Sequence, residues 1–111
     1  MPGSPAPDPA ELLQKIYMAG FELKNFAMFP KAIGVVRQEC VVLMVPDAET
    51  GLQMLGSPGW LIGEAIGVLT TTNGRRVFQA KGDVVDATNE RVEILRQFQA
   101  DLRSILDGER A

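Results

Sequence analysis

Two adjacent apolar runs in the middle of the chain constrain its fold most. They occupy residues 33–45, IGVVRQECVVLMV, and only a central Arg-Gln-Glu triplet interrupts them. Successive side chains of a strand point to opposite faces of a sheet, so runs this dense need cover on both faces. The stretch predicts a hairpin of residues 32–36 against residues 41–45. Because Gln38 and Glu39 are unfavourable in a type I′ turn, a two-residue and a four-residue loop both remain open.

A second hairpin is marked by an Asn-Gly pair at residues 73–74, which is the preferred pair for a type I′ turn. A two-residue turn at this pair places Leu69 opposite Phe78 on one face of the hairpin. The same register places Gly67 opposite Ala80. This face combines two large and two small side chains, and it is therefore suited to receive a closely packed helix.

Helix signals stand at the two ends of the predicted domain. Asp8 is placed as an N-cap before Pro9 at the first helical position, and Glu11 is spaced for a capping box. Near the other end, Thr88 can cap a helix whose apolar residues recur at helical spacing over residues 92–106. That stripe resembles a coiled-coil seam but lasts only about two heptads, so packing on the chain's own sheet is favoured.

The remaining segments have less distinct patterns. Residues 21–29 alternate in polarity, but the parity slips near Asn25, which favours a β-bulge or a break between a loop and a shorter strand. Residues 52–55 suit a short strand, and residues 56–59, GSPG, suit a loop because of their turn chemistry. Residues 60–64 fit a helical turn and the start of a strand equally well.

These patterns predict a single α+β domain over residues 8–111, after a flexible Pro-rich leader at residues 1–7. We expect an N-terminal helix, an antiparallel meander of about five to six strands, and a C-terminal helix packed on one sheet face. A sheet curled toward a half-barrel fits the same strand order. The length of 111 residues suits one domain better than two.

The composition excludes several classes of site. The chain has no histidine, which removes imidazole-based catalysis and histidine-ligated metals, and its one cysteine cannot form an intramolecular disulfide or a thiolate cluster. Two acidic pairs, Asp47 with Glu49 and Asp83 with Asp86, lie at predicted turns without the spacing of an EF-hand. We therefore expect no metal and no cofactor, and the missing catalytic groups favour a non-enzymatic protein.

The charge and the termini bear on location and partners. A net charge of −3 argues against the basic surface that nucleic acid or an anionic membrane requires. The first residues lack the basic and apolar regions of a secretory signal, and no uncharged apolar stretch is long enough for a membrane span. We expect a cytoplasmic protein that binds neither nucleic acid nor membrane.

Four residues are candidates for binding a ligand or a partner. Trp60 follows a Gly- and Pro-rich loop that would present it to a partner, unless it fills the core. Glu64 is either a charge that protects a strand edge or a carboxylate in a pocket. Cys40 is either a buried small apolar residue or, opposite Arg37, a reactive thiolate. The Tyr17 hydroxyl is a candidate for an enzymatic pocket.

The leading hypothesis is a small, soluble, non-enzymatic binding or accessory protein that is homodimeric and engages a protein segment or an apolar small molecule. It rests on the missing catalytic groups and on a surplus of apolar surface. One helix covers one sheet face, and a second copy is the preferred cover for the other. The alternatives are a histidine-independent enzyme that uses a carboxylate, tyrosine or cysteine in a pocket, and a structural subunit of a larger assembly.

Overall fold

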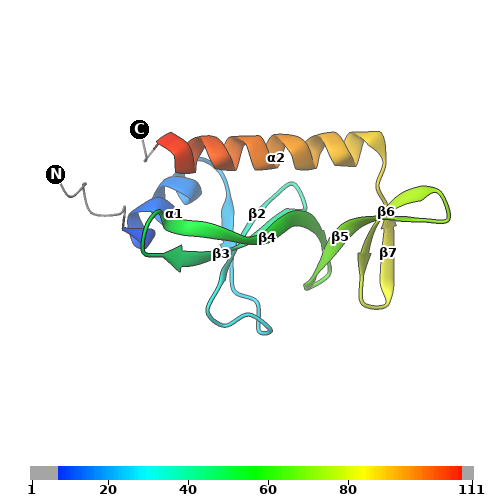
Figure 1. Cartoon of the computed structure of the whole chain (residues 1–111), viewed down its shortest axis with the longest axis horizontal. Coiled ribbons are helices and arrows are strands. Elements are labelled where there is room, and N and C mark those ends of the chain that lie inside the picture. Colours follow the sequence, from blue (N-terminus) through cyan, green and yellow to red (C-terminus); the bar gives the residue numbers. More distant parts are fainter. Residues whose placement is uncertain (1–7, 109–111) are drawn as a thin grey trace.

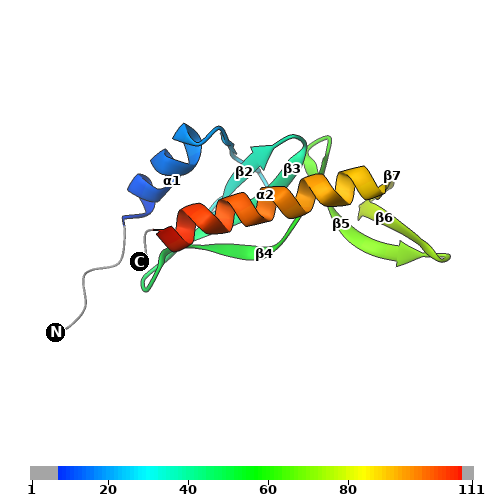
Figure 2. The same cartoon turned by 90° about the horizontal axis from the view of Figure 1, so that it is seen from above.

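A long C-terminal helix lies along a curled antiparallel sheet, and a shorter N-terminal helix lies beside its last turns (Figures 1 and 2). The computed structural model describes residues 8–108. The elements in chain order are α1 (Pro9–Met18), β1 (Glu22–Lys24), β2 (Ile33–Arg37), β3 (Cys40–Asp47), β4 (Gly51–Ile62), β5 (Ala65–Thr72), β6 (Arg75–Ala80), β7 (Asp83–Asp86) and α2 (Asn89–Gly108).

The seven strands pair strictly in chain order, and the sheet curls into a half-barrel. The predicted α+β class, the antiparallel meander and the two terminal helices are confirmed, with seven strands where five or six were expected. No helix of the described chain is long and apolar enough to cross a membrane. The predicted leader at residues 1–7 lies outside the described residues.

Both helices begin where the sequence predicts. The Asp8 side chain accepts a hydrogen bond from the backbone N–H of Ala10 at 3.0 Å, and Pro9 is the first residue of α1. The Thr88 hydroxyl accepts from the backbone N–H of Arg91 at 3.2 Å, which satisfies one free donor at the start of α2. Local capping chemistry therefore sets the start of each helix.

The first hairpin closes with a two-residue turn, so the four-residue alternative is excluded. Arg37 lies opposite Cys40, and Gln38 and Glu39 adopt φ angles of 50° and 69°. Such angles are uncommon for residues other than Gly, Asn and Asp. The pairs from Val36 opposite Val41 outward would be the same with a four-residue loop, so the two-residue turn adds only the pair of Arg37 and Cys40 to the ladder.

The second hairpin has the predicted register in every pair that it forms. Leu69 lies opposite Phe78, as expected from the Asn-Gly pair. The pairing with β6 ends at Val68 opposite Gln79, one pair before the predicted pair of Gly67 and Ala80, and on the other side of β5 Gly67 lies opposite Trp60 of β4. The first part of β5 thus pairs with β4 and the rest with β6, because the sheet bends between them.

Residues 56–59 do not form the predicted loop; they continue a strand. β4 runs unbroken over Gly51–Ile62, and the register shifts between Val41, opposite Gly59, and Leu43, opposite Leu55. The residues between Leu55 and Gly59 form a bulge, in which Gly56 has a φ of +77°. Turn-forming residues thus serve to bend a strand, and the helical alternative for residues 60–64 is wrong.

The polarity slip at residues 21–29 reflects a break between a short strand and a loop. β1 ends at Lys24, and the segment from residue 25 to residue 32 crosses to the other face of the sheet. Phe26 and Ala32 of this segment are buried against Val36, Val41 and Leu43. The bulge alternative for this segment is therefore wrong.

Apolar side chains pack on both faces of the sheet, as the dense central runs required. The main core lies between the sheet and the helices, and its buried members are Leu12, Ile16, Phe21, Val35, Cys40, Val42, Met44, Leu52, Trp60, Phe78, Ala87, Leu95, Phe98, Leu102 and Leu106. The segment around Phe26 covers the second face. Because the chain itself provides this cover, the second sheet face does not require a second copy.

Candidate functional site

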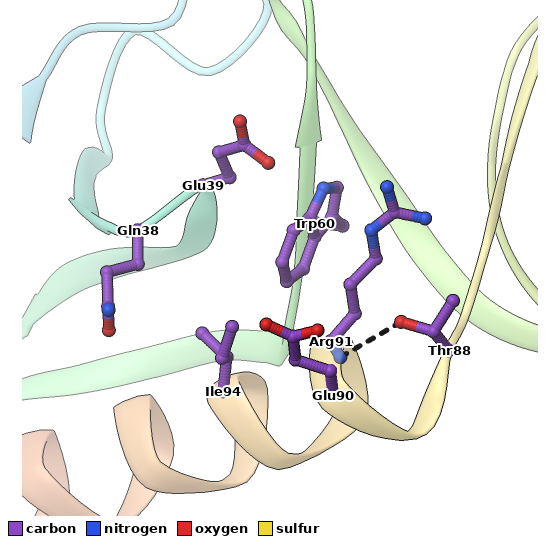
Figure 3. A pocket seen from close by; sticks show the side chains of 7 residues that line it. All are labelled: Gln38, Glu39, Trp60, Thr88, Glu90, Arg91 and Ile94. Carbon is purple, nitrogen blue, oxygen red and sulfur yellow. Dashed lines mark hydrogen bonds between the residues drawn. The ribbon is translucent and has the colours of Figure 1, made fainter.

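A concave surface of about 470 Å³ lies between the β2–β3 turn and the first turns of α2 (Figure 3). Trp60 of β4 forms its back wall. The turn and the helix approach each other here because the β2–β3 hairpin and α2 pack on the same core. The lining residues are Gln38, Glu39, Trp60, Thr88, Glu90, Arg91 and Ile94.

Trp60 belongs to the core and to this surface at the same time. It is 5% exposed and lies opposite the buried Cys40 in the sheet. Its ring stacks on Phe78 with centroids 5.3 Å apart and planes inclined by 20°, and the Arg91 guanidinium carbon lies 5.9 Å from the indole. Within residues 8–108 the indole Nε1 donates no hydrogen bond, which leaves a donor at the surface. Its binding role stays a prediction.

Two carboxylates stand on either side of the indole. Glu39 projects from the turn and Glu90 from the first turn of α2 (Figure 3). Neither forms an ion pair within the described chain. Arg91, the basic residue among those that line the surface, donates from Nη1 to the backbone oxygen of Asp86 at 2.8 Å. The surface therefore combines two carboxylates that have no ion-pair partner in the described chain, the Arg91 guanidinium and an apolar wall, and the carboxylates can accept a cation with an apolar stem.

Cys40 is fully buried in the main core beside Trp60. Burial raises the pKa of its thiol from 9.0 to about 11, because the thiolate would lose its hydration, and nearby Arg37 offsets only part of this effect. The thiol is therefore protonated at neutral pH. These properties favour the small buried apolar residue over the reactive thiolate.

A thiol reagent such as dithionitrobenzoate should leave Cys40 unmodified in the native protein at pH 8. The reagent should then react with the single thiol per chain in 8 M urea, where the side chain is exposed and its pKa returns to the ordinary value. Absorbance of the released thionitrobenzoate reports both rates, and Cys40→Ser supplies the blank. Modification of the folded protein within seconds would contradict this assignment.

The other two candidate residues lie away from the concave surface. Glu64 is exposed in the two-residue turn between β4 and β5, where Ile62 lies opposite Ala65. Tyr17 is 62% exposed near the end of α1. Neither Glu64 nor Tyr17 lines the surface beside Trp60. Of the four candidates, only Trp60 and Cys40 are neighbours.

Arg37 joins the β2–β3 hairpin to α2. Its Nη2 donates to Oδ2 of Asp101 at 2.7 Å, and its guanidinium carbon lies 4.5 Å from the centroid of Phe21. The hydrogen bond from Arg37, followed by one from Gln97, lowers the pKa of Asp101. This bridge helps to fix the turn that carries Glu39, on one side of the concave surface.

Replacing Asp101 by asparagine should remove part of the acid sensitivity of folding. The lowered pKa means that the folded state favours the carboxylate, so its stabilising contribution is present above the unfolded pKa of about 3.8 and lost as pH falls through the lower folded value. Urea midpoints should therefore differ between Asp101→Asn and the wild type at pH 7 and converge near pH 2. A constant difference across this range would contradict the bridge, and Asp83→Asn serves as the exposed control.

Residues 8–108 contain no group of three or more His, Cys, Asp or Glu side chains placed to hold a metal ion. No protein-family model, no curated protein and no solved structure matches the chain. The candidate site therefore stands on its geometry and on the chemistry of its own side chains.

Proposed function

We propose that this chain is a small binding protein that holds a basic segment of a partner protein on the concave surface beside Trp60. The observation that carries the proposal is the pair of carboxylates, Glu39 and Glu90, which flank the indole without an ion-pair partner in the described chain. A lysine or arginine side chain would lay its methylene stem on Trp60 and Ile94 and direct its charge to these carboxylates.

The polar groups of the surface favour a peptide over an apolar small molecule. The indole Nε1 is available to donate to a backbone carbonyl of the segment, and the Gln38 amide offers both a donor and an acceptor. A purely apolar ligand would strip water from two carboxylates without replacing their hydrogen bonds, which costs free energy. A segment that alternates basic and apolar residues satisfies both kinds of group.

A random heptapeptide display library tests the proposal without a known ligand. Selection on the wild-type protein should enrich peptides that carry a lysine or arginine next to an aliphatic or aromatic residue. Quenching of the single tryptophan then reports affinity. Exposed ion pairs contribute about 0.2–1 kcal/mol each, so Glu39→Gln with Glu90→Gln should raise Kd roughly two- to thirtyfold.

Glu64→Gln is the matched control, because it removes the same charge from an exposed turn outside the surface. Its Kd should equal that of the wild type. Enrichment of peptides without basic residues would contradict the proposal. So would equal affinity of the wild type and the double variant, because the two carboxylates would then not contact the segment.

A further inference from the structure

The strands at the two edges of the sheet differ in charge: β1 has one acidic and one basic residue, and β7 has an acidic residue at each end. β1 reads Glu22-Leu23-Lys24 at one end of the strand order, and β7 runs from Asp83 to Asp86 at the other. If β1 paired antiparallel with β1 of a second copy, centred on Leu23, each glutamate would lie opposite a lysine. The same operation on β7 would place aspartate opposite aspartate, and like charges directly opposite are destabilising.

Many of the exposed apolar side chains belong to the segment that contains β1. Nine large apolar residues are exposed in the described chain, and five of them fall between residues 17 and 29. They precede, occupy and follow β1: Tyr17 (62%), Met18 (76%), Leu23 (39%), Met28 (85%) and Phe29 (39%). The end of α1 contacts this strand, and the segment after it covers the second sheet face. Exposed apolar residues concentrated in one segment are typical of an interaction surface.

Among the described residues, β1 has a strand partner on one side only. The strand pairs with β2 through Glu22 opposite Val36 and Lys24 opposite Gly34. Among residues 8–108 no other strand pairs with it, and no turn or loop hydrogen bond involves residues 22–24. Outward-facing N–H and C=O groups of an edge strand are a template for another strand.

We propose that two copies of this chain associate through β1, antiparallel about a two-fold axis at Leu23. Glu22 of each copy lies opposite Lys24 of the other, and the two Leu23 side chains meet at the axis. Such an interface is isologous, because both copies use the same surface. The second sheet face plays no part in it, and the proposal is independent of any ligand beside Trp60.

The strand alone is too small for a stable interface, which needs roughly 800 Å² from each partner. Its three residues supply register and backbone hydrogen bonds. The remaining area must come from the elements next to β1 in the chain, where Tyr17 and Met18 at the end of α1 and Met28 and Phe29 in the segment after β1 are exposed. In this proposal the exposed apolar residues contribute to the area, and the charge pattern sets the orientation.

Charge reversal with mixing tests this interface on the full-length chain. Lys24→Glu places glutamate opposite glutamate in both symmetric pairs, and Glu22→Lys places lysine opposite lysine. Each variant alone should dissociate, with a dimer Kd about tenfold or more above that of the wild type. An equimolar mixture of the two should form a heterodimer, because every pair in it is again opposite in charge. Sedimentation velocity and native mass spectrometry measure both results.

The mixture also separates loss of the interface from loss of folding, since misfolded variants would not recover association when combined. Glu64→Lys is the control for an equal charge change at an exposed site and should dimerise like the wild type. A wild-type chain that stays monomeric at several hundred micromolar would overturn the proposal. So would a dimer that both reversals leave intact, because its interface would then lie elsewhere.

Discussion

Replacing Phe98 by alanine should lower the free energy of unfolding by about 3–5 kcal/mol, the usual cost of truncating a fully buried phenylalanine. Phe98 is completely buried at the middle of α2, and its ring meets Phe21 edge-on with centroids 5.6 Å apart and planes inclined by 69°. Phe21 in turn lies under the Arg37 guanidinium. The substitution would therefore leave a cavity where α2, the start of β1 and the first hairpin meet.

Urea titration followed by circular dichroism measures this loss. Arg103→Ala is the matched control, because Arg103 is exposed on the same helix and a surface change of this kind should stay within about 0.5 kcal/mol. A Phe98→Ala protein within 1 kcal/mol of the wild type would contradict the packing of α2 on the sheet.

Replacing Gly59 by alanine should cost about 1–3 kcal/mol, because the added methyl group has no space. A Cβ atom at this position would lie 2.3 Å from the carbonyl oxygen of Gly67 and 2.9 Å from Cγ2 of Ile66. The first contact is with backbone, so relief requires β4 and β5 to separate. Gly59 precedes Trp60, and the tryptophan fluorescence should change as well.

Gly108→Ala is the control for this substitution. Nothing lies within 4 Å of a Cβ atom at Gly108, so alanine should be neutral or stabilise by up to about 1 kcal/mol at that helix end. Gly59→Ala should therefore lower the midpoint temperature of thermal unfolding, and Gly108→Ala should leave it unchanged or raise it. Equal midpoints for Gly59→Ala and the wild type would contradict the close approach of β4 and β5.

The parts of the fold that could be predicted are those that neighbouring residues decide. An Asn-Gly pair sets the register of the second hairpin at its turn, and Asp8 and Thr88 start the helices through short-range hydrogen bonds. The density of apolar residues in the central runs correctly required cover on two faces. Each of these inferences needs only a few adjacent residues.

The wrong predictions concern segments whose conformation depends on contacts with residues far away in the sequence. GSPG at residues 56–59 suits a loop and a bulge equally, and only its pairing with β3 selects the bulge. Phe26 covers the second face because the chain crosses the sheet after Lys24, which no local pattern indicates. The sequence alone therefore favours a second copy as the cover of the second sheet face, whereas the structure places the segment around Phe26 there.

Of the residues that line the candidate site, only Trp60 could be predicted from the sequence. Trp60 is a candidate because it is the single tryptophan and follows a turn-rich segment, whereas no sequence pattern marks Glu39 or Glu90 as a binding residue. Glu39 belongs to a predicted turn, and an acidic residue in the first turn of a helix, such as Glu90, is favourable through the helix dipole alone. They become neighbours only because α2 packs across the sheet beside the first hairpin.

The most direct test of the binding function is the two-dimensional ¹H–¹⁵N spectrum of the full chain during titration with the peptide enriched by display. The single tryptophan gives one indole N–H resonance. That resonance should shift together with the amides of Gln38, Glu39 and residues 88–94. Shifts confined to α1, or to the hairpin of β5 and β6, would contradict the account, because the segment would then bind away from Trp60.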